Sequence, residues 1–506
     1  MKPEVSGDST TPGPRRWLGL DWLGWAAVGV AAVILFYQVI KPPIVGLADN
    51  GDFAKVMGPI GLKPVSEKSE DIYFNYLNTK YKYAIPGYYD PGYLTSERPI
   101  ASLARELALA TSDGGLFDIR ILGALHALLL LFGLALLLSA TRRLQLASRC
   151  ILAALLIWMF TDVGYVCTLN SFYSQTPSLL FLLIAAGFAA RMVNEGVAKL
   201  WNLSGFVIAS VLFISSKPQE VVNAPWLALV VLSAGLVQKN ALRKVLGPVL
   251  ALGLLVFAAW FYSQTPEGEI RKTALYHTVF YEMLVDSPNP RADLEALGVS
   301  GDLARFAGTN TYMPNSGITY PWFQAAFFDK VSLRHVLQFY LTHPSRFWQR
   351  IKKSASQGFI LKANLGHYDK ESGLPPFSQG MRFRLWSDFR QRALPGSPWT
   401  LLIIWGGSLV ASTLLYFRRQ ASAKERLGLM AFGTLNVMAV VAFLTCTLGD
   451  SLYDLVRHLF AFHAMIDLSL LIGIVWLVEV GVRAARERNR HIVADRPMAA
   501  AQASSS

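Results

Sequence analysis

Two carboxylates stand where the first long apolar run of the sequence gives way to polar residues. Asp49 and Asp52 belong to the stretch DNGDF at 49–53, a few residues after an apolar run over 22–41. A carboxylate beside a membrane is costly unless it is hydrated or paired, so this position favours a functional role. Either residue could take a proton from an attacking hydroxyl, as a general base does. The plainer alternative is that one of them caps a short helix beginning near Phe53.

Two cations occur in short loops that are expected on the same side as these carboxylates. Lys217 and Arg457 oppose the general bias of short loops, in which Lys and Arg mark the cytoplasmic side. A cation that opposes this bias at the end of a membrane helix suggests an anionic ligand. Each could instead pair with a nearby acid, Lys217 with Glu220 and Arg457 with Asp454.

Other polar side chains are expected at the same depth, at the outer ends of several helices. We predict that they form a substrate-binding bowl with the acids and cations. These side chains belong to Asn50, Asn170, Tyr173, Gln175, Gln219, Asp454 and His458. Plainer roles stay open for some of them, because Tyr173 can anchor a helix at the membrane interface and His458 can be a structural helix-end histidine.

The elements that must position these residues are membrane helices. The chain has 506 residues, of which 53% are hydrophobic and only 16% charged. This composition predicts an all-α polytopic membrane protein with about ten transmembrane helices. The expected spans are 22–41, 117–140, 150–168, 177–191, 203–216, 222–237, 246–262, 398–417, 427–446 and 462–482.

The basic residues of the short loops place both chain ends in the cytoplasm. The resulting organisation has five parts. They are a cytoplasmic segment 1–21, helices one to seven over 22–262 with a first outer loop at 43–116, an outer region 263–397, helices eight to ten over 398–482, and a disordered cytoplasmic tail 483–506.

The outer region 263–397 carries an excess of positive charge and a helix-like segment at 331–353. Helical spacing there is interrupted at His343-Pro344, which predicts two short helices. Arg346, Arg350, Lys352, Lys353 and Lys362 occur beside Phe347 and Trp348. Cations beside aromatics suit an amphipathic helix on a lipid surface, and an ordinary solvated helix pair is the alternative.

Several classes of site are not indicated. The sequence has no Cys/His cluster with zinc spacing, no glycine-rich phosphate loop and no nucleophile elbow. We predict no metal and no cofactor, although two carboxylates could hold a divalent ion. The net charge of +13 arises from cytoplasmic loops and the outer region, so nucleic acid is not implied.

A polar bowl open to lipid suits sugar transfer from a lipid-phosphate donor to an acceptor hydroxyl on the outer face. Cations would stabilise the phosphate as its bond to the sugar breaks. A transporter or flippase for a lipid-linked or anionic substrate is an alternative, but the sequence shows no repeated halves with broken helices. An O-antigen ligase or polymerase is a second alternative.

Short motifs along most of the chain resemble the Wsf-type hexosyltransferases of bacterial surface-glycan biosynthesis, which are integral-membrane enzymes similar to the GT-C class. The motifs are NGDF at 50–53, LNSFYSQTPSLLFLL at 169–183, SSKPQ at 215–219, HTVFYEMLVDSPNPRADLEALG at 277–298, THPSRF at 342–347 and DSLYDLVRHLFAFH at 450–463.

The resemblance implies a polyprenyl-phosphate sugar donor, a glycan or lipid acceptor, inversion at the anomeric carbon and an essential acid in the first outer loop. On this chain that acid is Asp52, with Asp49 as the runner-up. It also implies GT-C-like outer loops and interfacial helices, and a bacterial cytoplasmic membrane with the site facing outward. In the FYSQ stretch this chain has Gln175, so the resemblance offers no second carboxylate there.

Overall fold

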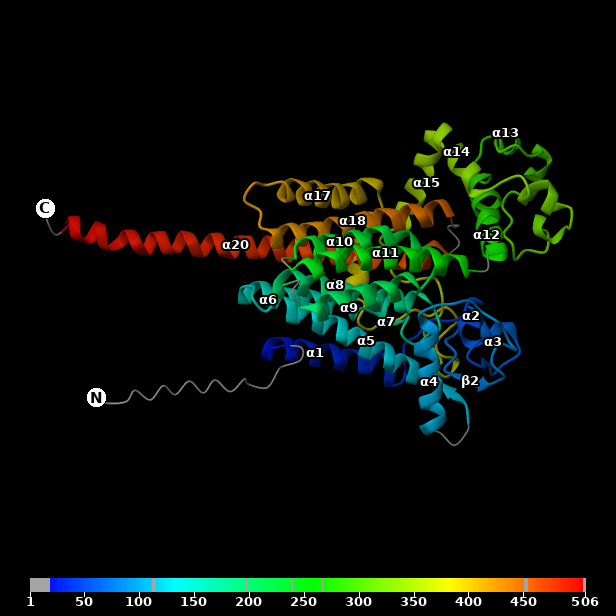
Figure 1. Ribbon diagram of the computed structural model, residues 1–506. Helices are drawn as coiled ribbons and strands as arrows, with labels where there is room; N and C mark the ends of the chain where they lie inside the picture. Colours follow the sequence, from blue (N-terminus) through cyan, green and yellow to red (C-terminus); the bar gives the residue numbers. More distant parts are fainter. Residues whose placement is uncertain are drawn as a thin grey trace.

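The computed structural model describes residues 19–503, apart from 112–114, 197–198, 239, 266 and 450–453. Most of the segment 1–21 and the first four residues of the last motif therefore lie outside the described residues. Figure 1 shows long helices running side by side, with two smaller lobes at one end of the bundle. We call that end the loop end.

The all-α polytopic membrane fold is confirmed. Among the described residues, eight helices are long and apolar enough to cross a membrane, and two shorter apolar helices accompany them. All ten overlap the expected spans, although the helix expected at 150–168 ends at Phe160 and is followed by the separate short helix α7 (Val163–Val166). They are α1 (Trp22–Leu35, continued by η1, Phe36–Ile40), α5 (Ile119–Ala140), α6 (Leu146–Phe160), α8 (Gln175–Glu195), α9 (Leu200–Ile214), α10 (Ala224–Leu236, preceded by η2, Pro218–Asn223), α11 (Ala241–Ser263), α17 (Pro398–Tyr416), α18 (Ala423–Gly449) and α20 (Phe460–Ala503).

The bundle is held together by apolar side chains between these helices. Helix α8 lies near its centre and packs against α5 and α9, and α18 packs against α17 and α20. Caps fix where two of the helices begin, since Asp21 accepts the N–H of Gly24 and Asp118 accepts the N–H of Arg120.

The first lobe covers residues 41–118 and contains a small sheet that the sequence analysis does not predict. Its elements are α2 (Ala54–Met57), β1 (Leu62–Pro64), α3 (Ser69–Ile72), β2 (Lys80–Tyr83), α4 (Glu97–Thr111) and β3 (Phe117–Asp118). The strands are antiparallel in the order β1-β2-β3, with Leu62 opposite Tyr83. Strands this short have too few residues for an alternation of apolar and polar side chains to be recognised, so the sequence does not predict the sheet.

The second lobe covers residues 267–357, and the break predicted at His343-Pro344 is present between α14 and α15. The elements are α12 (Glu267–Tyr276), η3 (His277–Met283), α13 (Pro290–Ala296), η4 (Gly301–Phe306), η5 (Gly317–Thr319), η6 (Gln324–Phe328), α14 (Leu333–Thr342) and α15 (Pro344–Gln357).

The cations expected on a lipid surface are largely paired inside this outer region. Their partners are acids distant in sequence, as in Arg346–Asp293 at 3.0 Å, Arg350–Glu282 at 2.8 Å and Lys362–Asp388 at 3.5 Å; Lys353 pairs with Asp286. These charges therefore hold the outer region together, and contact with membrane lipid remains a prediction.

After the second lobe the chain returns to the first. This return segment, 358–397, contains η7 (Lys370–Ser372) and α16 (Leu385–Ala393). The N–H groups of Gly46 and Ala48 donate to the carbonyls of His367 and Gly366, at 3.0 and 2.8 Å. The return segment thus stabilises the stretch of chain that precedes Asp49.

The end of the chain differs from expectation. Helix α20 continues to Ala503 through residues for which the composition predicts a disordered tail. The Ala, Arg and Glu residues of this stretch have high helix propensity, which a polar composition alone does not reveal.

Candidate functional site

The DNGDF stretch forms a tight turn at the loop end, and Asp49 holds it in shape. Asp49 is buried, and its Oδ1 accepts the N–H groups of Gly51 at 2.7 Å and Phe53 at 3.1 Å. Gly51 has φ +105°, a conformation that favours glycine. Asp49 therefore stabilises the turn before α2 (Ala54–Met57) and does not cap that helix, because the N-cap position is Phe53 and no side chain caps it.

Asp52 faces the other way and meets two cations. Its Oδ1 lies 2.6 Å from Lys55 Nζ, and its Oδ2 lies 2.6 Å from Arg457 Nη1. The Asp52 side chain is 33% exposed, whereas that of Arg457 is 5% exposed. The acid is thus held by a buried cation and still open on one side.

Arg457 also engages Asp454, because its Nε lies 2.7 Å from Asp454 Oδ2. The local pairing that the sequence left open for Arg457 is therefore present, but Arg457 joins Asp52 as well. Arg457 belongs to the short helix α19 (Leu455–His458), which precedes α20. Chain segments some 400 residues apart are brought together here.

Asn50 and Tyr173 support this cluster from below. Arg457 lies over the Tyr173 ring, 4.6 Å from its centroid. The Tyr173 hydroxyl donates to the Ala48 carbonyl at 2.8 Å and accepts the Asn50 N–H at 3.0 Å. The Asn50 side-chain amide donates to Asp454 at 3.1 Å. These contacts hold the DNGDF turn against the segment that carries Asp454 and Arg457.

Lys217 joins the cluster through His458. Its Nζ lies 3.0 Å from His458 Nδ1, and His458 Nε2 lies 3.7 Å from Asp454 Oδ2. The Gln219 side chain donates to the His458 carbonyl at 3.1 Å. A continuous polar network therefore runs from Asp52 to Lys217, which we call the outer cluster: Asp52, Lys55, Lys217, Gln219, Asp454, Arg457 and His458.

The remaining two predicted residues lie below the outer cluster. Asn170 is fully buried, and its amide donates to the carbonyls of Val39 and Val45. It therefore ties the end of the first span to the chain that leads to Asp49, and this packing gives it no access to a ligand. Sequence position predicts its depth correctly but not the direction of its side chain.

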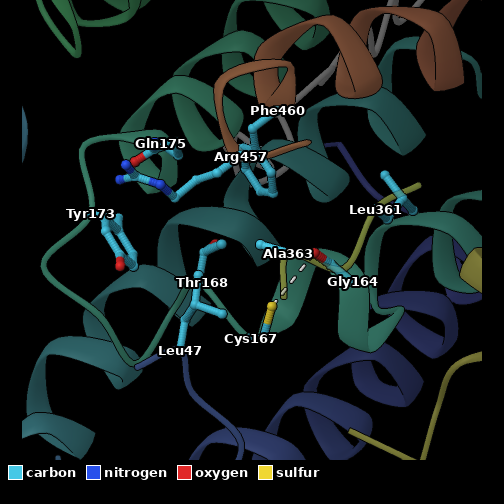
Figure 2. Close-up of a pocket in the computed structure, with 10 residues that line it drawn as sticks. All are labelled: Leu47, Gly164, Cys167, Thr168, Tyr173, Gln175, Leu361, Ala363, Arg457 and Phe460. Atoms are coloured by element: carbon cyan, nitrogen blue, oxygen red, sulfur yellow. Dashed lines mark hydrogen bonds between the residues drawn. The ribbon is translucent and has the colours of Figure 1, made fainter. Parts of the chain in front are cut away.

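Gln175 faces a small cavity of about 10 Å³ beneath the cluster, together with Tyr173, Thr168 and Arg457 (Figure 2). A cavity of this volume can hold about one water molecule. Among the described residues, the buried Gln175 Nε2 has no hydrogen-bond partner. Gln175 is thus next to the outer cluster without belonging to its open face.

The two carboxyls differ in electrostatic surroundings. Burial raises the pKa of the Asp49 carboxyl to about 7. Desolvation also acts on Asp52, but the charges of Arg457 and Lys55 outweigh it and hold the Asp52 pKa well below its usual range. Asp52 is therefore the charged, accessible member of the pair.

The sequence does not predict three residues of this region: Lys55, which belongs to the outer cluster, and Tyr93 and Tyr312, which lie next to it. The spacing of Lys55 from Asp52 at i and i+3 could have indicated this pair. The Tyr93 hydroxyl lies 3.1 Å from Ser174 Oγ, and the charges of the cluster act on both tyrosines. Tyr312 is 77% exposed and comes from the second lobe, so both lobes border the cluster.

The part of the chain that the structure describes has no group of three His, Cys, Asp or Glu side chains that could hold a metal ion. Metal independence stays a prediction. The arrangement offers a charged carboxylate, several cations and an open side, which together suit an anionic ligand.

Comparison with known proteins adds a family. The model of the family described as YfdI N-terminal transmembrane domain matches residues 22–495. A search of curated proteins finds no match. The apo crystal structure of the Archaeoglobus fulgidus oligosaccharyltransferase is similar over 93% of this chain and 52% of its own, with 14% identity and a TM-score of 0.38. This chain spans about half of that protein.

Proposed function

The chain belongs to the YfdI N-terminal transmembrane domain family, and from that premise we propose that it is a membrane glycosyltransferase. It would move a hexose from a polyprenyl-phosphate donor to a glycan or lipid acceptor of the bacterial cell envelope. The reaction would take place at the loop end, on the outer face of the cytoplasmic membrane. In its more specific form, the proposal is that the protein is a GT-C-like hexosyltransferase of the Wsf type, which its short motifs resemble.

One observation carries the proposal: the accessible carboxylate of Asp52 lies between two cations at the end of a membrane bundle. Lys55 and Arg457 each contact one of its oxygens. A base beside cations is the pairing required when a hydroxyl attacks a sugar and a phosphate leaves. The site also lies at helix ends, where a lipid-borne phosphate can arrive from the bilayer.

The reaction would be a single displacement. The acceptor oxygen forms a bond to the anomeric carbon, and the bond from that carbon to the phosphate oxygen breaks. The acceptor proton passes to Asp52, and the electron pair of the broken bond stays on the polyprenyl phosphate. Attack on the side opposite the leaving group inverts the configuration at the anomeric carbon.

Donor binding would prepare the base. In the present structure the charges of Lys55 and Arg457 hold the Asp52 pKa low, which makes Asp52 a weak base. A phosphate group near the same cations would compete for them, and its negative charge would raise the Asp52 pKa. Lys217 and His458 sit at the far side of the outer cluster and would share the phosphate charge.

Asp49 would act as a positioning residue. It is buried and its Oδ1 already accepts two backbone N–H groups, so it shapes the turn that presents Asp52. The conservative variant Asp49→Asn keeps an oxygen acceptor at that position.

Surface-glycan mass spectrometry of a deletion strain tests the function in the cell. We expect the loss of one hexose, restored by the wild-type gene and not by an Asp52→Asn gene expressed at the same level. Unchanged glycans in the deletion strain would contradict glycosyl transfer to the cell surface. Uptake of substrate into proteoliposomes without covalent transfer would favour a transporter instead.

A further inference from the structure

A second cavity lies inside the helix bundle, away from the outer cluster. Its volume is about 780 Å³, in the range of pockets that hold small ligands. Most of its lining residues belong to α8, α18 and α20, and most of its surface is apolar; α5, α6, α9, α10 and α17 contribute the other helical lining residues. The mechanism proposed above uses no part of this cavity.

The polar opening of the cavity is at the opposite end of the bundle from the outer cluster. Its rim includes Arg483, which follows Phe460, the first residue of α20, by six helical turns. At about 1.5 Å per residue this separation is about 34 Å, close to the thickness of a bilayer core. The opening therefore lies at the other membrane surface, which the distribution of Lys and Arg predicts to be cytoplasmic.

The charged residues that line the rim are two Arg and two Glu, and two further cations lie next to it. Arg418 and Arg483 line it, and Arg143 and Lys424 both donate to the carbonyl of Asn194, another lining residue. The rim acids are Glu425 and Glu479.

Both acids are already engaged by the protein. Glu425 accepts the N–H of Ser422, and Glu479 pairs with Arg483 and accepts the N–H of Gln145. Three exposed cations, Arg143, Arg418 and Lys424, therefore stand against the one acid that Arg483 does not pair with, Glu425.

We propose that this cavity is a binding site for an anionic phospholipid of the membrane leaflet at that end. The acyl chains would occupy the apolar interior, and the phosphate would lie among Arg418, Lys424 and Arg143. An apolar volume next to a cationic rim at a membrane surface matches both parts of such a lipid. A polar, water-soluble ligand would make no favourable apolar contact with this wall.

This site is distinct from the donor site of the proposed function. The headgroup would lie about one bilayer thickness from Asp52, so the lipid would not take part in sugar transfer. It would instead fill the space between α8, α18 and α20 and stabilise their packing. The proposal therefore stands or falls independently of glycosyl transfer.

Native mass spectrometry of the full chain tests it. The detergent-purified protein would be delipidated and then mixed with phosphatidylglycerol or phosphatidylcholine of equal chain length. We expect one tightly bound phosphatidylglycerol and clearly weaker binding of phosphatidylcholine. Equal binding of the two lipids would overturn the anionic headgroup assignment.

Two kinds of variant separate the two halves of the site. The double variant Arg418→Gln, Lys424→Gln should reduce the preference for phosphatidylglycerol, by about fivefold per cation removed. Its matched control, Arg486→Gln, Arg488→Gln, removes the same charge farther along α20 and should keep the preference.

The second variant, Gly473→Phe, fills the cavity itself. Gly473 lines the cavity, and a Cβ added there meets no atom within 4 Å, so the backbone should accept a side chain. We expect loss of the bound lipid whatever its headgroup. Retention of wild-type lipid binding by both Gly473→Phe and the rim double variant would refute the proposal.

Discussion

Two carboxylate–arginine pairs in this protein have similar contact distances but differ in the exposure of the carboxylate. Asp467 lies 2.8 Å from Arg390, and both side chains are fully buried. Asp52 lies 2.6 Å from Arg457, but its side chain is 33% exposed. The first pair lies inside the bundle and the second lies at its loop end.

The surroundings of the two acids explain the difference. Asp467 also accepts hydrogen bonds from the Tyr165 hydroxyl at 2.6 Å and Trp386 Nε1 at 2.7 Å, so protein donors satisfy it from several sides. Among the described residues, the Asp52 carboxylate has only cations, Lys55 and Arg457, as side-chain partners, and it keeps an open side. A carboxylate enclosed by protein donors holds elements together, whereas one that keeps an open side can meet a substrate.

The largest effect should come from breaking the enclosed pair. Asp467→Asn leaves the Arg390 charge buried without a counterion, which typically costs about 3–5 kcal/mol. Its thermal midpoint in detergent should fall strongly. The double variant Arg390→Met, Asp467→Leu removes both charges and should be less destabilised than Asp467→Asn. A midpoint for Asp467→Asn equal to that of the wild type would show that the pair is not structural.

The pH dependence of transfer distinguishes Asp52 from Asp49 as the base. The charges of Arg457 and Lys55 hold the Asp52 pKa low in the free enzyme, so its carboxylate stays charged as the pH falls. The value of kcat/KM, which reports the free enzyme, should therefore be nearly flat from pH 7.5 to 5.5. With a pKa of about 7, Asp49 would instead become protonated over this range. A value of kcat/KM that drops about 16-fold between pH 7 and 5.5 would therefore assign the base to Asp49.

A smaller effect is expected at the edge of the outer cluster. Lys217→Gln removes one charge that would share the donor phosphate, and the donor KM should rise about fivefold to tenfold with a smaller change in kcat. Lys199→Gln is a matched control, because Lys199 pairs with Glu195 at the other end of the bundle. An unchanged KM in Lys217→Gln would leave Lys217 a structural role only.

The sequence predicts the membrane helices well because long apolar runs have few alternative structures. It also predicts that Asp52 and Arg457 converge, since a cation against the positive-inside bias marks a special position. The same reasoning fails for Asn170, whose depth is right but whose amide faces Val39 and Val45. It also misses the partnership of Arg390 with Asp467, because a contact across 77 residues leaves no local pattern.

The most direct test of the account is sugar transfer by purified protein in liposomes that contain a defined polyprenyl-phosphate hexose. Asp52→Asn should lower the transfer rate by about 10²–10⁴-fold with a thermal midpoint close to that of the wild type. Asp49→Asn, which keeps the turn contact, should retain most of the rate. Full transfer activity of folded Asp52→Asn protein would contradict the assignment of the outer cluster as the site of glycosyl transfer.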